Sequence, residues 1–177
     1  MEIIEKNSKN NEYRDQILEL LAKYNDEGTP PTAQLSREVL AEDGEELSFD
    51  EAIELYYEEL TDDLVAMVEK GEVVGFLMIK DKDPYFKNRA PDYWPSLAIT
   101  HALVDEDYRR EGVASELLEY TIEKVCPRKN LPYLVWATSS ENNASQRFIQ
   151  NHGFEKVNTI KDDRKEGVHT LIYAREI

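Results

Sequence analysis

The stretch His101-Ala-Leu-Val-Asp-Glu-Asp-Tyr-Arg-Arg-Glu-Gly-Val-Ala114 decides the fold of this chain. It begins as an apolar strand, passes through an acidic turn and an arginine pair, and bends at Gly112. A helix follows at once, because apolar residues recur at helical spacing at Val113, Leu117, Leu118, Ile122 and Val125. The first N–H groups of a helix are unpaired and point one way, and glycine lets an anion approach the backbone. The stretch therefore predicts a seat for phosphate oxygens.

A second motif runs from Asn142 to Phe154. Asn142 can open a short helix, and Gly153 suits the left-handed residue that ends one. With the earlier Arg109-x-x-Gly112-x-Ala114, this motif resembles the paired signatures of the GNAT superfamily of acyl-CoA-dependent N-acetyltransferases. The resemblance implies an enzyme that moves an acetyl group from acetyl-CoA to a primary amine, most simply that of a small molecule.

The hydrophobic pattern predicts the remaining elements along the chain. Strands are expected over 2–5, 63–69, 73–80, 96–104, 133–137, 154–160 and 168–174, and helices over 13–24, 33–41, 49–60, 113–125 and from 142. This order matches the resembled family. It predicts an α/β (α+β) GNAT fold, in which helices flank a central mixed, mostly antiparallel sheet.

Local signals set several of the expected boundaries. The first helix should stop before Gly28 and the Pro30-Pro31 pair, and Cys126-Pro127 should end the central helix. Ser48-Phe49-Asp50-Glu51 is a capping box, and Lys70-Gly71 reads as a hairpin turn. The connection from Asp81 to Pro95 is too long for a hairpin loop and too aromatic for a disordered linker. It could be a lid over the acceptor site, a subunit interface that forms a homodimer, or a cover for the sheet edge.

Length, composition and charge limit the class of protein. The 177 residues predict a single domain over residues 1–177, and a hydrophobic fraction of 41% argues against disorder. No stretch approaches the roughly 20 apolar residues of a membrane span, and the first residues lack the apolar core of a signal peptide. We therefore expect a cytoplasmic protein with no membrane partner. The single Cys126 allows no internal disulfide, and no metal-ligand cluster is present, so no metal is expected.

The net charge of −16 argues against nucleic acid as a partner, because phosphate contacts need a basic surface. The charge is compatible with a cationic amine as the acceptor, although a solvated acidic surface is the simpler explanation. Asp50, Glu51, Glu54 and Glu58 lie along one predicted helix and would present this charge.

The resemblance implies which residues bind the cofactor. Backbone N–H groups of the turn would hold the pyrophosphate, namely those of Arg109, Arg110, Glu111, Gly112, Val113 and Ala114. The backbone of Leu103 and Val104 would pair with the pantetheine arm. Asn142 would bind near the same arm, while Ser145 and Phe148 line the cofactor. Asn142 could equally be a plain helix cap, and Phe148 a core aromatic residue.

The catalytic residues follow the family pattern less closely. Relatives often carry a tyrosine acid at the position of Ile149, and Ser145 is a conceivable substitute. They also often carry a glutamate base on the strand, where this chain has Thr100 and His101. His101 is the better candidate, because imidazole accepts a proton near neutral pH, but it could also be a core histidine. A carboxylate of the 50–58 helix acting through water is a further option.

Other functions fit the same residues. The missing tyrosine and glutamate favour a sensor that binds acyl-CoA without turnover. Acetylation of proteins or peptides would need an open groove, which the aromatic connection disfavours. A purely structural or dimerising role would make both motifs accidental. The fold alone does not choose among these.

Overall fold

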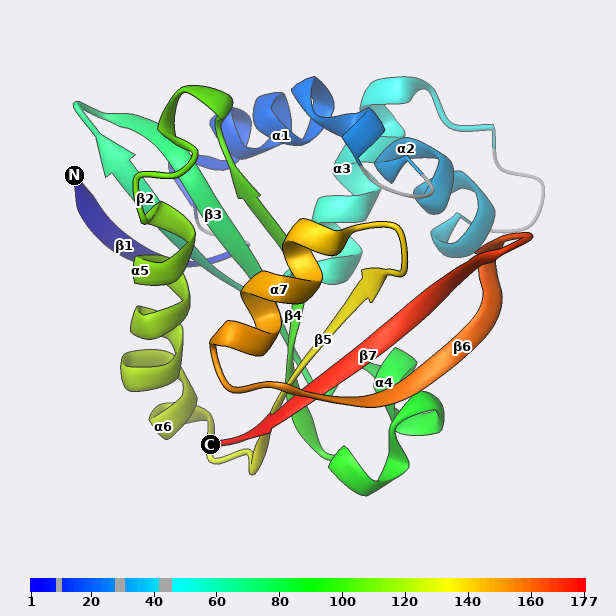
Figure 1. Ribbon diagram of the computed structural model, residues 1–177. Coiled ribbons are helices and arrows are strands. Elements are labelled where there is room, and N and C mark those ends of the chain that lie inside the picture. The colour runs from blue at the N-terminus through cyan, green and yellow to red at the C-terminus, as the bar shows by residue number, and fades with distance from the viewer. Residues whose placement is uncertain (9–10, 28–30, 42–45) are drawn as a thin grey trace. The chain divides into compact units, whose positions relative to one another are not determined.

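The computed structural model describes residues 1–8, 11–27, 31–41 and 46–177 (Figure 1). Within them, seven strands form one sheet in the order β1-β2-β3-β4-β5-β7-β6. The β4–β5 pair is parallel from Ser96 to Ile99, and the β1–β2, β5–β7 and β6–β7 pairs are antiparallel. This confirms the predicted α/β class with a mixed sheet flanked by helices. The predicted break from Gly28 to Pro30 lies outside the described residues.

The chain divides into two compact units, residues 1–78 with 101–117 and residues 79–100 with 118–177. The first unit contains β1 (Glu2–Asn7), α1 (Arg14–Lys23), α2 (Thr32–Leu35), a π-helical turn (Ser36–Leu40), α3 (Phe49–Leu60) and β2 (Asp63–Glu69). It also takes most of β3 (Glu72–Asp81), the end of β4 (Ser96–Val104) and the start of α5 (Val113–Tyr120).

The core of the first unit lies between its helices and one face of its strands. The amphipathic faces of α1 and α3 supply Ile17, Leu21, Ile53 and Tyr57, which pack with strand residues such as Phe76. The predicted capping box is present, since Ser48 and Glu51 exchange side-chain to backbone bonds at the start of α3. Lys70 and Gly71 both have positive φ, 53° and 87°, as the predicted two-residue hairpin turn requires.

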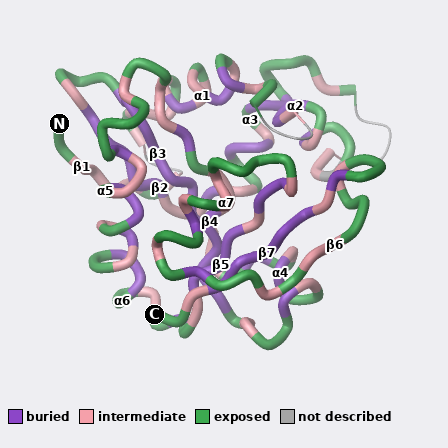
Figure 2. Tube along the Cα trace, in the orientation of Figure 1, coloured by how far each residue is buried: buried purple, intermediate pink, exposed green. Residues whose placement is uncertain are grey.

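The second unit contains α4 (Pro84–Arg89), a π-helical turn (Thr121–Val125), α6 (Cys126–Lys129), β5 (Tyr133–Ser139), α7 (Asn143–Asn151), β6 (Glu155–Lys165) and β7 (Val168–Glu176). Its two last strands form a long hairpin (Figure 1). Figure 2 shows the trace buried along β5 and β7 and largely exposed along β6, which is the edge strand.

The aromatic connection between β3 and β4 packs on the sheet of the second unit. Phe86 and Ala90 are buried against Val135 of β5 and Ile172 of β7. Tyr85 and Arg89 also bond the edge strand β6, through Asp163 and Asn158. The connection is therefore a cover for the sheet, over its face as well as its edge. The lid and subunit-interface options stay predictions.

The predicted end of the central helix at Pro127 is wrong. The helical path continues to Lys129, and the chain leaves it at Asn130, whose φ is 52°. A π-helical turn over Thr121–Val125 makes this possible, because the N–H of Cys126 bonds the carbonyl of Thr121 five residues earlier. Pro127 then lies in the first turn of α6, where no N–H group is needed.

Candidate functional site

The turn after β4 is built from two backbone irregularities. Asp105 caps a short 3-10 helix, Glu106–Tyr108, by accepting the N–H of Asp107. Arg110 and Gly112 then take positive φ angles of 70° and 91°, which bend the chain into the start of α5 at Val113. A residue other than glycine rarely adopts this region, so the positive φ of Arg110 is an unusual feature of the turn.

The bend exposes backbone donors at the beginning of α5. Within the described part of the chain, no backbone carbonyl accepts the N–H of Arg110, Glu111 or Gly112. A Cβ atom at Gly112 would have only Glu116 Oε1 near it, at 3.9 Å, so the space beside this glycine is open. Exposed N–H groups at the positive end of a helix dipole form the kind of anion seat that the sequence predicts.

The side chain of Arg109 faces the protein. Its Nη2 donates to both carboxylate oxygens of Glu27 at 2.9 Å, and its Nε donates to the carbonyl of Val104 at 3.0 Å. Its guanidinium also lies over the ring of Tyr24, 4.9 Å from the centroid. Both arginines are exposed, but of the two only Arg109 is paired with a carboxylate in the described part of the chain. Arg110 is therefore the arginine whose charge is not offset by a partner, which the sequence could not distinguish from Arg109.

Gly75 of β3 is a site residue that the sequence reasoning missed. A Cβ atom there would lie 2.9 Å from Val113 Cγ1 and 3.1 Å from the carbonyl oxygen of Leu103. The missing side chain lets the start of α5 and the end of β4 pack directly on β3. An isolated glycine within a strand pattern is the signal for such a close approach, and it was available in the sequence.

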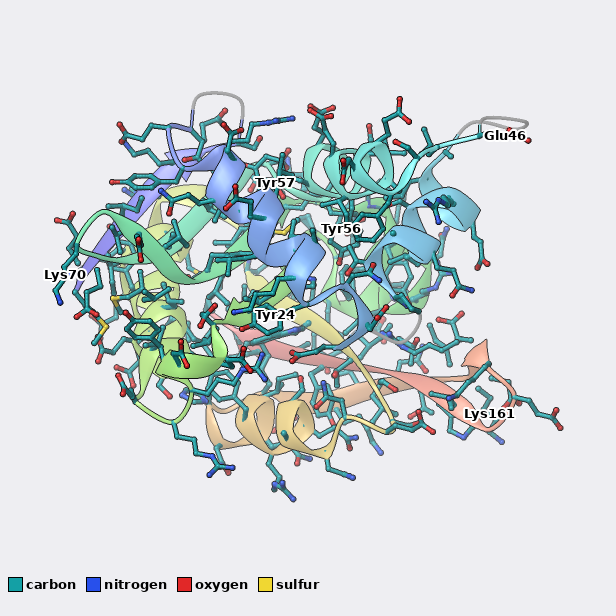
Figure 3. The ribbon with its side chains drawn as sticks, turned by 90° about the horizontal axis from the view of Figure 1, so that it is seen from above. Tyr24, Glu46, Tyr56, Tyr57, Lys70 and Lys161 are labelled. Atoms are coloured by element: carbon teal, nitrogen blue, oxygen red, sulfur yellow. The ribbon has the colours of Figure 1, made fainter. Side chains whose placement is uncertain are left out.

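His101 lies on β4 with aromatic neighbours from two other elements of the first unit. Its Nδ1 is 3.0 Å from the hydroxyl of Tyr56 on α3, and its ring stacks on Phe76 of β3. Tyr56 is labelled on α3 in Figure 3. Burial lowers the pKa of His101 to about 4, so the imidazole is neutral at physiological pH. The residue is half-buried, and one ring nitrogen lies at hydrogen-bond distance from Tyr56, so the core and the catalytic interpretations both stay predictions.

The carboxylates of α3 are largely engaged within the protein. Glu51 closes the capping box, which lowers its pKa, and Glu54 and Glu58 both bind the guanidinium of Arg14. Asp50 is exposed at the start of the helix. Much of the negative charge that the sequence assigned to an acceptor is therefore balanced locally.

Helix α7 of the second unit has the predicted cap. Asn142 Oδ1 accepts the N–H of Ser145 at 3.0 Å, and Gly153 has a φ of 79° just past the end of the helix. Phe148 packs edge-on against Trp136, with ring centroids 6.0 Å apart. Ile149 is fully buried. Phe148 is half-buried, so its packing against Trp136 leaves part of the ring exposed, and both roles that the sequence left open stay predictions.

A family comparison decides which class of protein carries this turn. The model of the acetyltransferase (GNAT) family matches residues 20–154, which include both motifs. The chain belongs to the acetyltransferase (GNAT) family. No curated protein matches the sequence significantly.

Solved GNAT structures share the fold over essentially the whole chain. An N-acetyltransferase from Staphylococcus aureus Mu50 is 22% identical, with a TM-score of 0.67 and coverage of 99% of both chains. A ribosomal-protein-alanine N-acetyltransferase from Brucella melitensis is 21% identical, with a TM-score of 0.64 and coverage of 100% of both. An aminoglycoside 6'-N-acetyltransferase complexed with coenzyme A is 17% identical, with a TM-score of 0.67 and coverage of 99% and 97%. At these identities the likeness shows a shared fold and nothing more.

Three further features of this GNAT chain concern metal binding, membrane insertion and an open groove. Among the described residues, no group of three or more His, Cys, Asp and Glu side chains is arranged to hold a metal ion. No helix in the same parts of the chain is long and apolar enough to cross a membrane. An open groove of about 780 Å³ lies in the second unit, lined by residues such as Tyr93, Glu123 and Arg175, and includes none of the predicted site residues.

Proposed function

We propose that this GNAT protein transfers an acetyl group from acetyl-CoA to the primary amine of a small molecule. The turn after β4 carries the proposal. It presents the N–H groups of Arg110, Glu111 and Gly112 at the start of α5, without a backbone partner in the described residues. These donors suit the pyrophosphate of the cofactor, and family membership supports acyl transfer.

Other residues take the cofactor roles that the family resemblance implies. The backbone of Leu103 and Val104 pairs with the pantetheine arm in this proposal, and Asn142, Ser145 and Phe148 are the remaining cofactor residues. The family model spans residues of both units, which supports a single domain over residues 1–177.

The reaction needs little covalent chemistry from the protein. The amine nitrogen attacks the thioester carbonyl carbon, the C–S bond breaks, and the amine loses one proton while the departing thiolate gains one. Positioning supplies much of the acceleration in such a step. Ser145 and His101 are the proposed proton carriers. His101 begins neutral, because its pKa of about 4 keeps it unprotonated, but that pKa also makes it a weak base. The acceptor amine must therefore reach the site largely deprotonated, and the rate should rise with pH.

The acceptor is proposed to be a small amine, and a cationic one is the first choice. An aminoglycoside acetyltransferase is among the proteins of the same fold, as is a ribosomal-protein-alanine acetyltransferase. Asp50 is the acidic residue of α3 whose carboxylate is exposed at the helix start, while Glu54 and Glu58 are paired with Arg14.

A non-catalytic acyl-CoA sensor is the second candidate. Ile149 occupies the position of the family's tyrosine acid and is fully buried, so no hydroxyl serves there. This observation favours binding without turnover.

Two measurements on the purified protein separate these candidates. Calorimetry with acetyl-CoA tests cofactor binding, and release of free thiol tests turnover with a panel of spermidine, an aminoglycoside, an acidic amino acid and a peptide with a free N-terminus. Binding with thiol release by a cationic amine supports the proposal. Tight binding with no release for any amine supports the sensor, and the absence of binding overturns both. Preference for the acidic amino acid or the peptide overturns the choice of acceptor.

A further inference from the structure

The end of α1 is tied to the turn after β4 by a connected set of side chains. Tyr24 lies at the end of α1 (Figure 3), and its hydroxyl donates to Asp105 Oδ2 at 3.2 Å and accepts the N–H of Glu106 at 2.9 Å. Lys23 binds the same carboxylate oxygen at 2.9 Å. Although burial works in the opposite direction, this hydrogen bond helps to lower the pKa of Asp105. The residues that precede the phosphate seat are thus held by α1.

Arg109 joins the seat to the same segment. Its Nε bonds the carbonyl of Val104, the last residue of β4, while its Nη2 bonds Glu27 in the short 3-10 helix Asn25–Glu27 after α1. Its planar group rests on the ring of Tyr24. One guanidinium therefore connects the strand end, the turn and the residues after α1. Only a fork with several fixed donors can make these bonds together.

We infer that Arg109 positions the phosphate seat instead of binding phosphate with its side chain, and that Glu27 and Tyr24 are its positioning partners. This inference rests on the proposed cofactor binding and assigns new roles within it. The carboxylate of Glu27 already offsets the charge of Arg109, and the arginine donors that bind Glu27 and Val104 are occupied. Cofactor phosphates would then be bound by the backbone N–H groups and by the exposed Arg110.

Two variants of Arg109 distinguish a residue that positions the phosphate seat from one that binds phosphate through its charge. Arg109→Lys keeps the positive charge but cannot hold Val104 and Glu27 at once, and Arg109→Gln loses both the charge and the fork. If Arg109 positions the seat, both variants should weaken acetyl-CoA binding to a similar degree, about fivefold, since the contacts are exposed and individually weak. The salt dependence of the affinity should stay that of the wild type. Near-wild-type binding by Arg109→Lys would overturn the inference.

Variants of the two partners, Glu27 and Tyr24, test the positioning role further, and Glu27→Gln gives results of opposite sign for positioning and for phosphate binding by Arg109. Glu27→Gln should weaken binding if the carboxylate positions Arg109, and should tighten it if Glu27 competes with phosphate for the guanidinium. Tyr24→Phe keeps the ring but loses both hydrogen bonds, and should also weaken binding. In turnover assays, these variants should raise KM for acetyl-CoA with little change in kcat. Tighter or unchanged binding in Glu27→Gln overturns the inference.

The matched control is Lys6→Gln, which removes an ion pair between the half-buried Lys6 and the exposed Glu12 in the same unit. It should leave the affinity for acetyl-CoA unchanged.

A measurement without cofactor keeps the inference separate from the proposed function. In the free protein, the amide of Glu106 should exchange its hydrogen faster in Tyr24→Phe than in the wild type, because its acceptor is gone. If the wild type fails to bind acetyl-CoA, the proposed function is wrong. Unchanged hydrogen exchange in Tyr24→Phe would overturn the positioning role itself.

Discussion

The turn after β4 and helix α7 both correspond to short sequence motifs, but different forces hold them. Helix α7 is fixed locally, since Asn142 bonds Ser145 three residues on and His152 bonds the carbonyl of Phe148 four residues back. The turn is fixed by residues distant in the sequence, because Tyr24 and Glu27 each form a hydrogen bond with a residue 82 positions later. A motif can therefore predict the shape of either segment, but only the fold reveals what holds the turn.

The largest effect is expected for His101, on the strand that leads into the turn, and concerns the unfolding free energy of the protein at acid pH. The folded-state pKa of His101, about 4, lies below its ordinary value of 6.5 because the ring is buried beside Tyr56. Below pH 6.5 the unfolded chain binds this proton more readily than the folded one does. The stabilising contribution is therefore complete above pH 6.5 and is lost as the pH falls to 4, on the order of 3 kcal/mol.

His101→Gln removes this titration while leaving a polar group near Tyr56. Urea unfolding of both proteins at several pH values measures the difference in unfolding free energy. We expect the wild type to lose its advantage over the variant between pH 6.5 and 4. A difference that stays constant over that range would show that burial does not hold the ring neutral. Circular dichroism at pH 8 checks that the variant keeps the fold.

A pair of glycine variants tests the shape of the turn itself. Gly112 and Gly71 have almost the same φ, 91° and 87°, so alanine should strain the backbone by a similar amount, about 1–2 kcal/mol, at either position. At Gly112 the new methyl group also stands in the open space where the anion is proposed to approach. We expect Gly112→Ala to weaken acetyl-CoA binding at least tenfold and Gly71→Ala to leave it unchanged. Calorimetry measures the affinities, and equal loss in both variants would remove the seat from this bend.

What the sequence predicts correctly consists of local chemistry. The capping box at Ser48, the hairpin turn at Lys70-Gly71 and the cap at Asn142 each involve residues within a few positions, so the local sequence specifies them. The order of strands and helices follows from periodicity in the same way. The fold class could be predicted from the sequence for this reason.

What the sequence misses depends on contacts formed by folding. Nothing near Arg109 indicates that Glu27 will neutralise it, and nothing near His101 identifies Tyr56 as its partner. The helix through Pro127 was missed because a wider turn removes the need for the absent N–H group. The boundary rule for proline assumes regular α-helix, which this segment does not keep.

A smaller effect tests the local side of the comparison. Asn142→Ala removes the side-chain acceptor of the Ser145 N–H and should cost about 1 kcal/mol of unfolding free energy. Asn142→Asp should retain most of the stability, because aspartate caps equally well. Asn143→Ala, at the exposed first position of α7, is the control and should change little. Thermal unfolding of the three variants measures this, and equal losses at both positions would show that the cap does not stabilise α7.

The smallest expected effect concerns the charge that the turn leaves exposed. Arg110 has no carboxylate partner comparable to Glu27 of Arg109 among the ion pairs of the described residues, so its field reaches an approaching anion through solvent. Arg110→Glu should weaken acetyl-CoA binding a fewfold at low salt, and the loss should shrink at high salt because exposed charges are screened within about 10 Å at 0.1 M. Arg110→Gln should show about half of the low-salt effect, since it removes the charge without reversing it. Affinities measured over a range of salt concentrations decide the matter. A loss independent of salt would mean that the substitutions disturb the left-handed backbone at Arg110, and the phosphate seat would then owe its affinity to the backbone N–H groups alone.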